Sequence, residues 1–168
     1  MGSSKPVHIR RNIDNYRDPY LEASGDTFMV CSECHAVFQG QHWYLADQAR
    51  KAGVRLGEKS PTSGLCPACQ KSRDNVPGGI LTISGVFAAQ HREEIFNLIH
   101  NENERAMGVN PLERVMSVEG TEDGFEVTTT NERLAQRIGR ALHKAYDGEV
   151  IYRWSGDTKL ARVAWRRG

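Results

Sequence analysis

The stretch ILTISGVFAAQHREEIFNLIHNENERA, residues 80–106, decides the fold class of the C-terminal half of the chain. Its first four residues are apolar or β-branched and predict a strand over Ile80 to Ile83. From Val86 to about Ala106 the apolar side chains recur at helical spacing, which predicts an amphipathic helix. Asn110-Pro111 follows and ends that helix. The stretch is therefore the first half of a βαβ unit.

A hairpin, a second helix and two more strands are predicted after this unit. Alternating patterns over Arg114 to Glu119 and Phe125 to Thr129 flank a turn that contains glycine, as in a hairpin. The second helix is expected to begin after the run Thr128 to Thr130, one of whose hydroxyls would cap it, and to end near Tyr146. The last two strands are predicted over residues 150–154 and 162–165.

The predicted order of these elements is β-α-β-β-α-β with one extra strand. This order is that of the split βαβ, or ferredoxin-like, arrangement. In that arrangement both helices lie on one face of an antiparallel sheet. We therefore predict an α+β domain of this kind over residues 79–168.

Two Cys-x-x-Cys pairs carry the strongest chemical signal: Cys31-Ser-Glu-Cys34 and Cys66-Pro-Ala-Cys69. The two-residue spacing lets a tight turn present both sulfurs to one ion, and two such pairs supply four ligands at about 2.3 Å from zinc. Because four thiolates leave no coordination position for water, the predicted zinc ion is structural and not catalytic.

Two other interpretations of the cysteines are disfavoured. The sequence from Cys31 to His35 also matches the haem-attachment pattern, but haem would leave the second pair unexplained. A thioredoxin-like redox pair is disfavoured because neither pair is expected to follow a strand and open a helix within a βαβ pattern. Zinc thus remains the predicted cofactor.

The cysteines define a zinc-ribbon module over residues 28–78. It is rich in glycine and has too little apolar material for a core of its own. The 31 residues between the two pairs exceed the usual spacing of roughly 15–20, so a segment from about Trp43 to Gly64 is expected to loop out. Residues 1–27 are polar, show no periodicity and are interpreted as an extended basic arm.

No segment approaches the roughly 20 consecutive apolar residues that a membrane helix needs. The first residues also lack the apolar centre of a signal peptide. We therefore expect a cytoplasmic protein without membrane contacts. In such a reducing compartment paired cysteines are metal ligands more often than disulfides.

The formal net charge of +1 hides an uneven distribution. Residues 81–130 contain nine acidic and three basic side chains, whereas residues 131–168 contain nine basic and four acidic ones. Such an asymmetry orients a protein on a polyanion, and it is equally compatible with an internal or intersubunit contact.

Four cations recur on one face of the second predicted helix: Arg133, Arg137, Arg140 and Lys144. At about 100° per residue they fall within a sector of roughly 60°, beside an apolar face. The simplest interpretation is a solvated helix face. Further cations along the chain favour instead a distributed surface for RNA phosphates. RNA contacts are therefore predicted at these four residues and at Arg10, Arg11, Arg50, Lys51, Arg55, Lys71, Arg73, Arg166 and Arg167.

The chain contains none of the common catalytic motifs. It lacks a Walker A sequence, a Gly-x-Ser-x-Gly elbow and a His-Glu-x-x-His helix, and no cysteine remains outside the two pairs. We therefore predict that the protein is not an enzyme.

Several segments together resemble a family of small bacterial zinc-ribbon proteins and, more distantly, the ribosomal large-subunit export adaptor family. The resemblance is carried by Asp18-Pro19-Tyr20, by both cysteine pairs with their flanking residues, by Asn110 to Met116 and by Thr128 to Gly139. It implies binding to the ribosome or to ribosomal RNA.

From the residues and the resemblance we expect a zinc-stabilised, RNA-binding protein associated with the ribosome. A stress or hibernation factor is the narrowest form of this expectation. The alternative is a protein-interaction or regulatory module that forms a homodimer, in which the acidic helix of one chain meets the basic helix of another.

Overall fold

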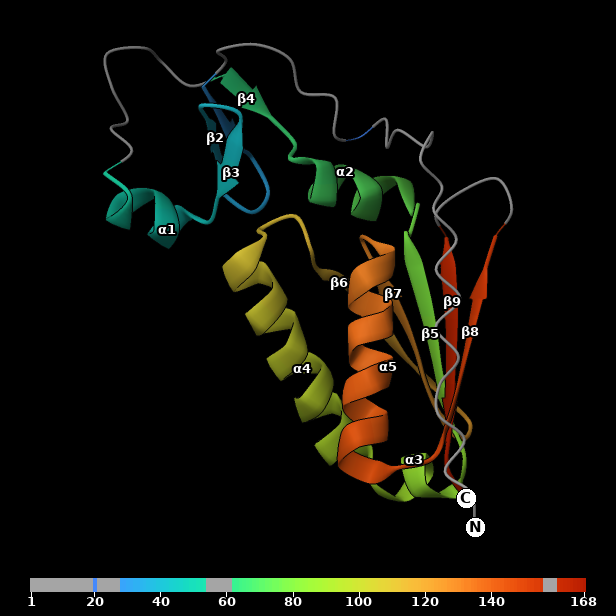
Figure 1. The fold of residues 1–168 in the computed structure, drawn as a ribbon. Helices are drawn as coiled ribbons and strands as arrows, with labels where there is room; N and C mark the ends of the chain where they lie inside the picture. The colour runs from blue at the N-terminus through green and yellow to red at the C-terminus, as the bar shows by residue number, and fades with distance from the viewer. Residues whose placement is uncertain (1–19, 21–27, 54–61, 156–159) are drawn as a thin grey trace.

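The computed structural model describes residues 20, 28–53, 62–155 and 160–168. The predicted extended basic arm over residues 1–27 thus lies outside the described residues, apart from Tyr20. The described elements form two sheets (Figure 1). We call residues 28–53 and 62–74 the cysteine module, and residues 79–155 and 160–168 the α+β domain.

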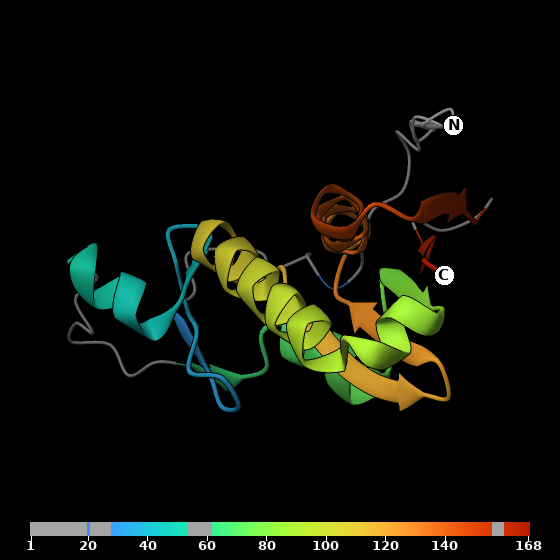
Figure 2. The ribbon, with the colours of Figure 1, turned by 90° about the horizontal axis from the view of Figure 1, so that it is seen from below.

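Five strands form the sheet of the α+β domain, in the spatial order β6-β7-β5-β9-β8. Two helices, α4 (Arg92–Val109) and α5 (Glu132–Tyr146), cover one face of this sheet (Figure 1). Figure 2 looks nearly along α5 and shows α4 beside it. The α+β class and the predicted order of elements are confirmed. The strand bounds are Gly79–Ser84 (β5), Val115–Thr121 (β6), Gly124–Thr129 (β7), Glu149–Trp154 (β8) and Ala161–Arg166 (β9).

The predicted all-antiparallel sheet is wrong for one pair of strands. Strand β9 lies between β5 and β8 and runs parallel to β5, whereas the other neighbouring strands of this sheet are antiparallel. Burial explains why β9, and not β8, lies beside β5. Its alternate residues Ala161, Val163 and Trp165 face the helices and are buried. The corresponding residues of β8 are only half-buried, which suits an edge strand.

The first predicted helix is divided in two. Helix α3 (Val86–Gln90) is followed by His91, whose φ of −117° and ψ of 39° are not helical, and α4 begins at Arg92. Helix α5 matches its prediction, but its cap is Asn131 and not one of the threonines. The Asn131 Oδ1 accepts the Leu134 N–H at 3.0 Å.

The core of the α+β domain lies between the sheet and the two long helices. Its buried residues include Leu81 and Ile83 of β5, Ile138 of α5 and Trp165 of β9. The indole N–H of Trp165 donates to the Asp147 carbonyl at 2.8 Å, so this large side chain is both buried and hydrogen-bonded.

The cysteine module contains a four-stranded sheet in the order β3-β2-β1-β4 and two helices, α1 (Ala46–Lys51) and α2 (Pro67–Asp74). A zinc ribbon is not confirmed, because the second cysteine pair lies at the start of a helix: Cys66 is the N-cap of α2. The predicted looped-out segment contains α1, while residues 54–61 lie outside the described residues. The strand bounds are Met29–Cys31 (β1), Val37–Gln39 (β2), His42–Tyr44 (β3) and Thr62–Gly64 (β4).

Within the described residues, none of the helices combines the length and the apolar character needed to cross a bilayer.

Candidate metal centre and basic surface

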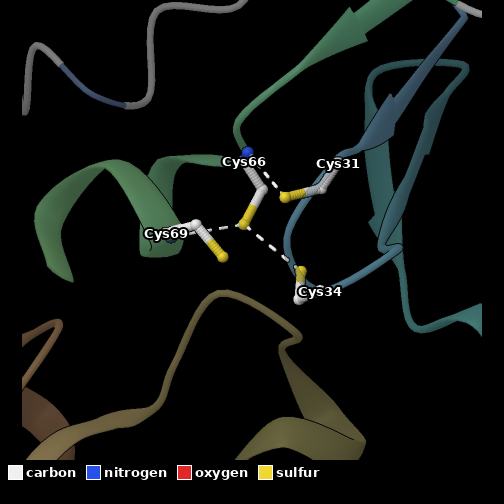
Figure 3. Close-up of side chains that lie close together, drawn as sticks. All are labelled: Cys31, Cys34, Cys66 and Cys69. Atoms are coloured by element: carbon white, nitrogen blue, oxygen red, sulfur yellow. Dashed lines mark hydrogen bonds between the residues drawn. The ribbon is translucent and has the colours of Figure 1, made fainter. Parts of the chain in front are cut away.

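The four cysteine sulfurs converge on one point at the junction of β1 and α2 (Figure 3). All four Sγ atoms lie within 4.8 Å of one another. In a tetrahedral site with metal–sulfur bonds of about 2.3 Å, neighbouring sulfurs are about 3.8 Å apart. The Cys34 and Cys66 sulfurs are separated by 3.7 Å. The donor set and its spacing therefore fit one metal ion.

Local backbone structure places each sulfur. His35 adopts a left-handed φ of 62°, and its N–H donates to the Cys31 carbonyl at 3.0 Å, which closes the turn around the first pair. The amide N–H of Cys66 donates to the Cys31 sulfur at 3.3 Å, and that of Cys69 to the Cys66 sulfur at 3.4 Å (Figure 3). These amides and the N-terminus of α2 favour negative charge on the sulfurs.

The proximity of the sulfurs shifts the pKa values of the thiols. A hydrogen bond with Cys66 lowers the pKa of Cys34 to about 4, while the same bond, with burial, raises the pKa of Cys66. Burial raises the pKa of Cys69 to about 11.

Arg114 is the residue of this site that sequence reasoning missed. It lies between α4 and β6, and its guanidinium donates to the Cys34 sulfur at 3.3 Å and to the Cys69 sulfur at 3.7 Å. Burial lowers the pKa of Arg114, but the hydrogen bond and the negative charge of the cysteine cluster outweigh it, so the pKa is raised overall. The only available signal was its place within the Asn110 to Met116 segment of the family resemblance.

One part of the argument against a redox role is wrong, because Cys66 and Cys69 follow a strand, β4, and open a helix, α2. The next strand, β5, lies in the other sheet, so these elements do not form a βαβ unit. The metal interpretation instead rests on the first pair, because Cys31 and Cys34 bring two further sulfurs to the same point.

Helix α5 presents only part of the predicted basic stripe to solvent. Arg133, Arg140 and Lys144 are exposed, and none of the three forms an ion pair with another described residue. Arg137 instead contacts α4, where its Nε lies 2.8 Å from the Glu102 carboxylate. The Glu102 side chain is only 12% exposed. Arg137 therefore links the two helices.

The predicted cation Lys71 is enclosed in the protein. Its residue is 9% exposed, and the ammonium donates to the Thr130 carbonyl at 3.0 Å and lies 5.9 Å from the centre of the Tyr20 ring. An ammonium in this position is not accessible to a phosphate. We therefore remove Lys71 from the predicted RNA surface.

The remaining predicted cations within the described residues lie on or beside elements other than α5, namely α1, α2 and β9. Arg50 pairs with Asp47 and Arg73 with Asp74, both on the exposed surface of the cysteine module. Lys51 and Arg166 are exposed. Arg167 lies over the Phe87 ring, 4.2 Å from its centre. The other predicted contacts, Arg10, Arg11 and Arg55, lie outside the described residues.

No protein-family model matches the chain, and no curated protein matches its sequence. The metal centre and the α5 cations are therefore the features on which a functional proposal depends.

Proposed function

We propose that this chain is a noncatalytic RNA-binding protein stabilised by one structural zinc ion. The observation that carries the RNA part is the row formed by Arg133, Arg140 and Lys144, which are exposed and unpaired among the described residues on a helix that is packed against the sheet. We call these three residues the α5 row.

Zinc is the proposed metal because of the donor set. Four thiolates at tetrahedral spacing select zinc or an iron–sulfur cluster among the common metals. A set of four thiolates also leaves no coordination position for a substrate or for water, which supports a structural role. Mass spectrometry of the native protein tests this proposal, with one zinc per chain as the expected result and no metal or iron as the contradicting one.

The spacing of the α5 row suits a phosphate backbone. From Arg133 to Lys144 the row extends over about 16 Å, at 1.5 Å per residue, and so can contact more than one phosphate. A helix holds the cations in a fixed relative position, and contacts of this type neutralise phosphates without selecting a sequence. The family resemblance favours ribosomal RNA as the partner.

The binding of RNA or ribosomes is expected to weaken steeply with salt. Each phosphate that the protein neutralises releases counterions. On single-stranded RNA this contributes about −0.7 to the slope of log binding constant against log salt concentration. Three cations then give a slope near −2. Titration of labelled ribosomal RNA at several salt concentrations, with cosedimentation with ribosomes as a second assay, measures this slope. An affinity that does not change with salt would count against the proposal.

The alternative, a homodimer in which an acidic helix meets a basic helix, loses support from the helix pair itself. Helices α4 and α5 already meet within one chain through Glu102 and Arg137. Glu102 also lies 3.2 Å from Arg105, so its negative charge is engaged in the same chain. Copurifying nucleic acid distinguishes the two proposals, since a dimer free of nucleic acid at low salt favours the alternative.

A further inference from the structure

We infer that a metal ion held by the four cysteines strengthens the contact through which Arg114 joins the cysteine module to the α+β domain. Metal occupancy then stabilises the docking of one unit on the other. This inference rests on the proposed metal site, but it concerns a residue outside the ligand set and a second property, the contact between the two units.

The first step is the position of Arg114. It belongs to the α+β domain, yet its guanidinium reaches one cysteine of each pair, Cys34 and Cys69. Its Nε donates to the Pro111 carbonyl in the same loop. This bond helps to orient the guanidinium toward the sulfurs. The contact therefore requires both cysteine pairs to be held together, which is what a shared metal ion does.

The second step is the charge. One divalent ion with four thiolates carries a net charge of −2. Arg114 is half-buried, and none of the carboxylates in the described residues lies within ion-pair distance of it. The sulfurs of the metal site are thus the anionic partner of this cation. A half-buried guanidinium without such a partner is unfavourable, so loss of the metal site is expected to loosen the loop that carries Arg114.

The third step is a connected set of hydrogen bonds around Thr130. Its hydroxyl donates to the Leu112 carbonyl at 2.7 Å and accepts the Arg114 N–H at 2.9 Å, and its carbonyl accepts from Lys71 of α2. Leu112 also packs against the cysteine cluster. The next residue, Asn131, caps α5. The contacts therefore extend from the metal site to the start of the helix that carries the α5 row.

Arg114→Gln in the full-length protein tests the inference. A residue that supports a metal ligand in this way typically contributes 10- to 100-fold in metal affinity, so competition with a zinc chelator should show a loss in that range. Arg114→Lys retains the charge but cannot contact two sulfurs in the same way. Its zinc affinity should therefore lie between those of the wild type and Arg114→Gln. Arg105→Gln is the matched control. Arg105 is exposed and pairs with Glu102, not with a cysteine, so its replacement should not change zinc affinity.

Hydrogen exchange provides the second readout, on docking itself. In the wild-type protein, removal of zinc should speed exchange at residues 110–114 and 129–131, which lie in the α+β domain. In Arg114→Gln these amides should exchange faster even with zinc bound, and the chelator should add little.

Three results separate the possible failures. A wild-type protein that binds no metal contradicts the proposed function before the docking question arises. A wild-type protein that binds one zinc ion but shows unchanged exchange at residues 110–114 and 129–131 after chelation overturns the inference alone, even if Arg114→Gln does not fold. Equal zinc affinity in wild type and Arg114→Gln also overturns it.

Discussion

Cys66→Ser is expected to abolish metal binding and to unfold the cysteine module while most of the α+β domain stays folded. The buried apolar cluster of the module is small and includes the proposed ligands Cys31 and Cys66 themselves, with Ala36 and Ala68. Metal binding contributes about 10–16 kcal/mol to the folding of zinc-finger peptides, far more than such a cluster provides. The core of the α+β domain is independent of the cysteines.

Metal content and the far-ultraviolet spectrum measure this effect. The variant should bind no zinc and lose part of its secondary structure, and the wild type should lose a similar part after chelation. Ser32→Ala is the control, because Ser32 is exposed within the first pair and its side chain makes none of the described contacts. A variant that retains a full equivalent of zinc would show that Cys66 is not a ligand.

The order of strands and helices was predictable because it depends on local patterns. Burial alternates along β7 and β9, and α5 has one apolar face, so each element could be identified from its own residues. The place of β9 beside β5 was not predictable in the same way. It depends on which of the last two strands buries its side chains more completely, which is a property of the assembled sheet.

The convergence of the four cysteines was also predictable, because Cys-x-x-Cys spacing is a local requirement of metal geometry. Arg114 was not, since it lies 45 and 80 residues from the cysteines it contacts, and no local sequence pattern connects it with them. Lys71 and Arg137 show the same limit. Both are recognisable in the sequence as cations, but only the tertiary structure shows that Lys71 bonds to Thr130 and Arg137 to Glu102.

Replacing Arg133 and Arg140 together with glutamine is expected to weaken RNA binding strongly without unfolding the protein. If both residues neutralise phosphates, the slope of log binding constant against log salt concentration becomes shallower by about 1.4. If the variant and the wild type bind RNA equally at 1 M salt, the affinity of the variant at 0.1 M salt is then about 25-fold lower than that of the wild type. Both side chains are exposed, and glutamine is nearly as good a helix former as arginine, so stability should change by less than about 0.5 kcal/mol. Arg137 is left intact because its contact with Glu102 would confound the result.

The matched control is the double variant Glu93→Gln, Glu94→Gln in the first turn of α4. Both carboxylates are exposed, and their removal should leave RNA affinity equal or slightly higher, because two negative charges are lost. The dimer proposal predicts a different pair of results, in which both double variants weaken self-association and neither changes RNA binding. Should the arginine variant bind ribosomal RNA and ribosomes as tightly as the wild type, with the same salt slope, the α5 row is only a solvated helix face, and any RNA contact must be made elsewhere on the protein.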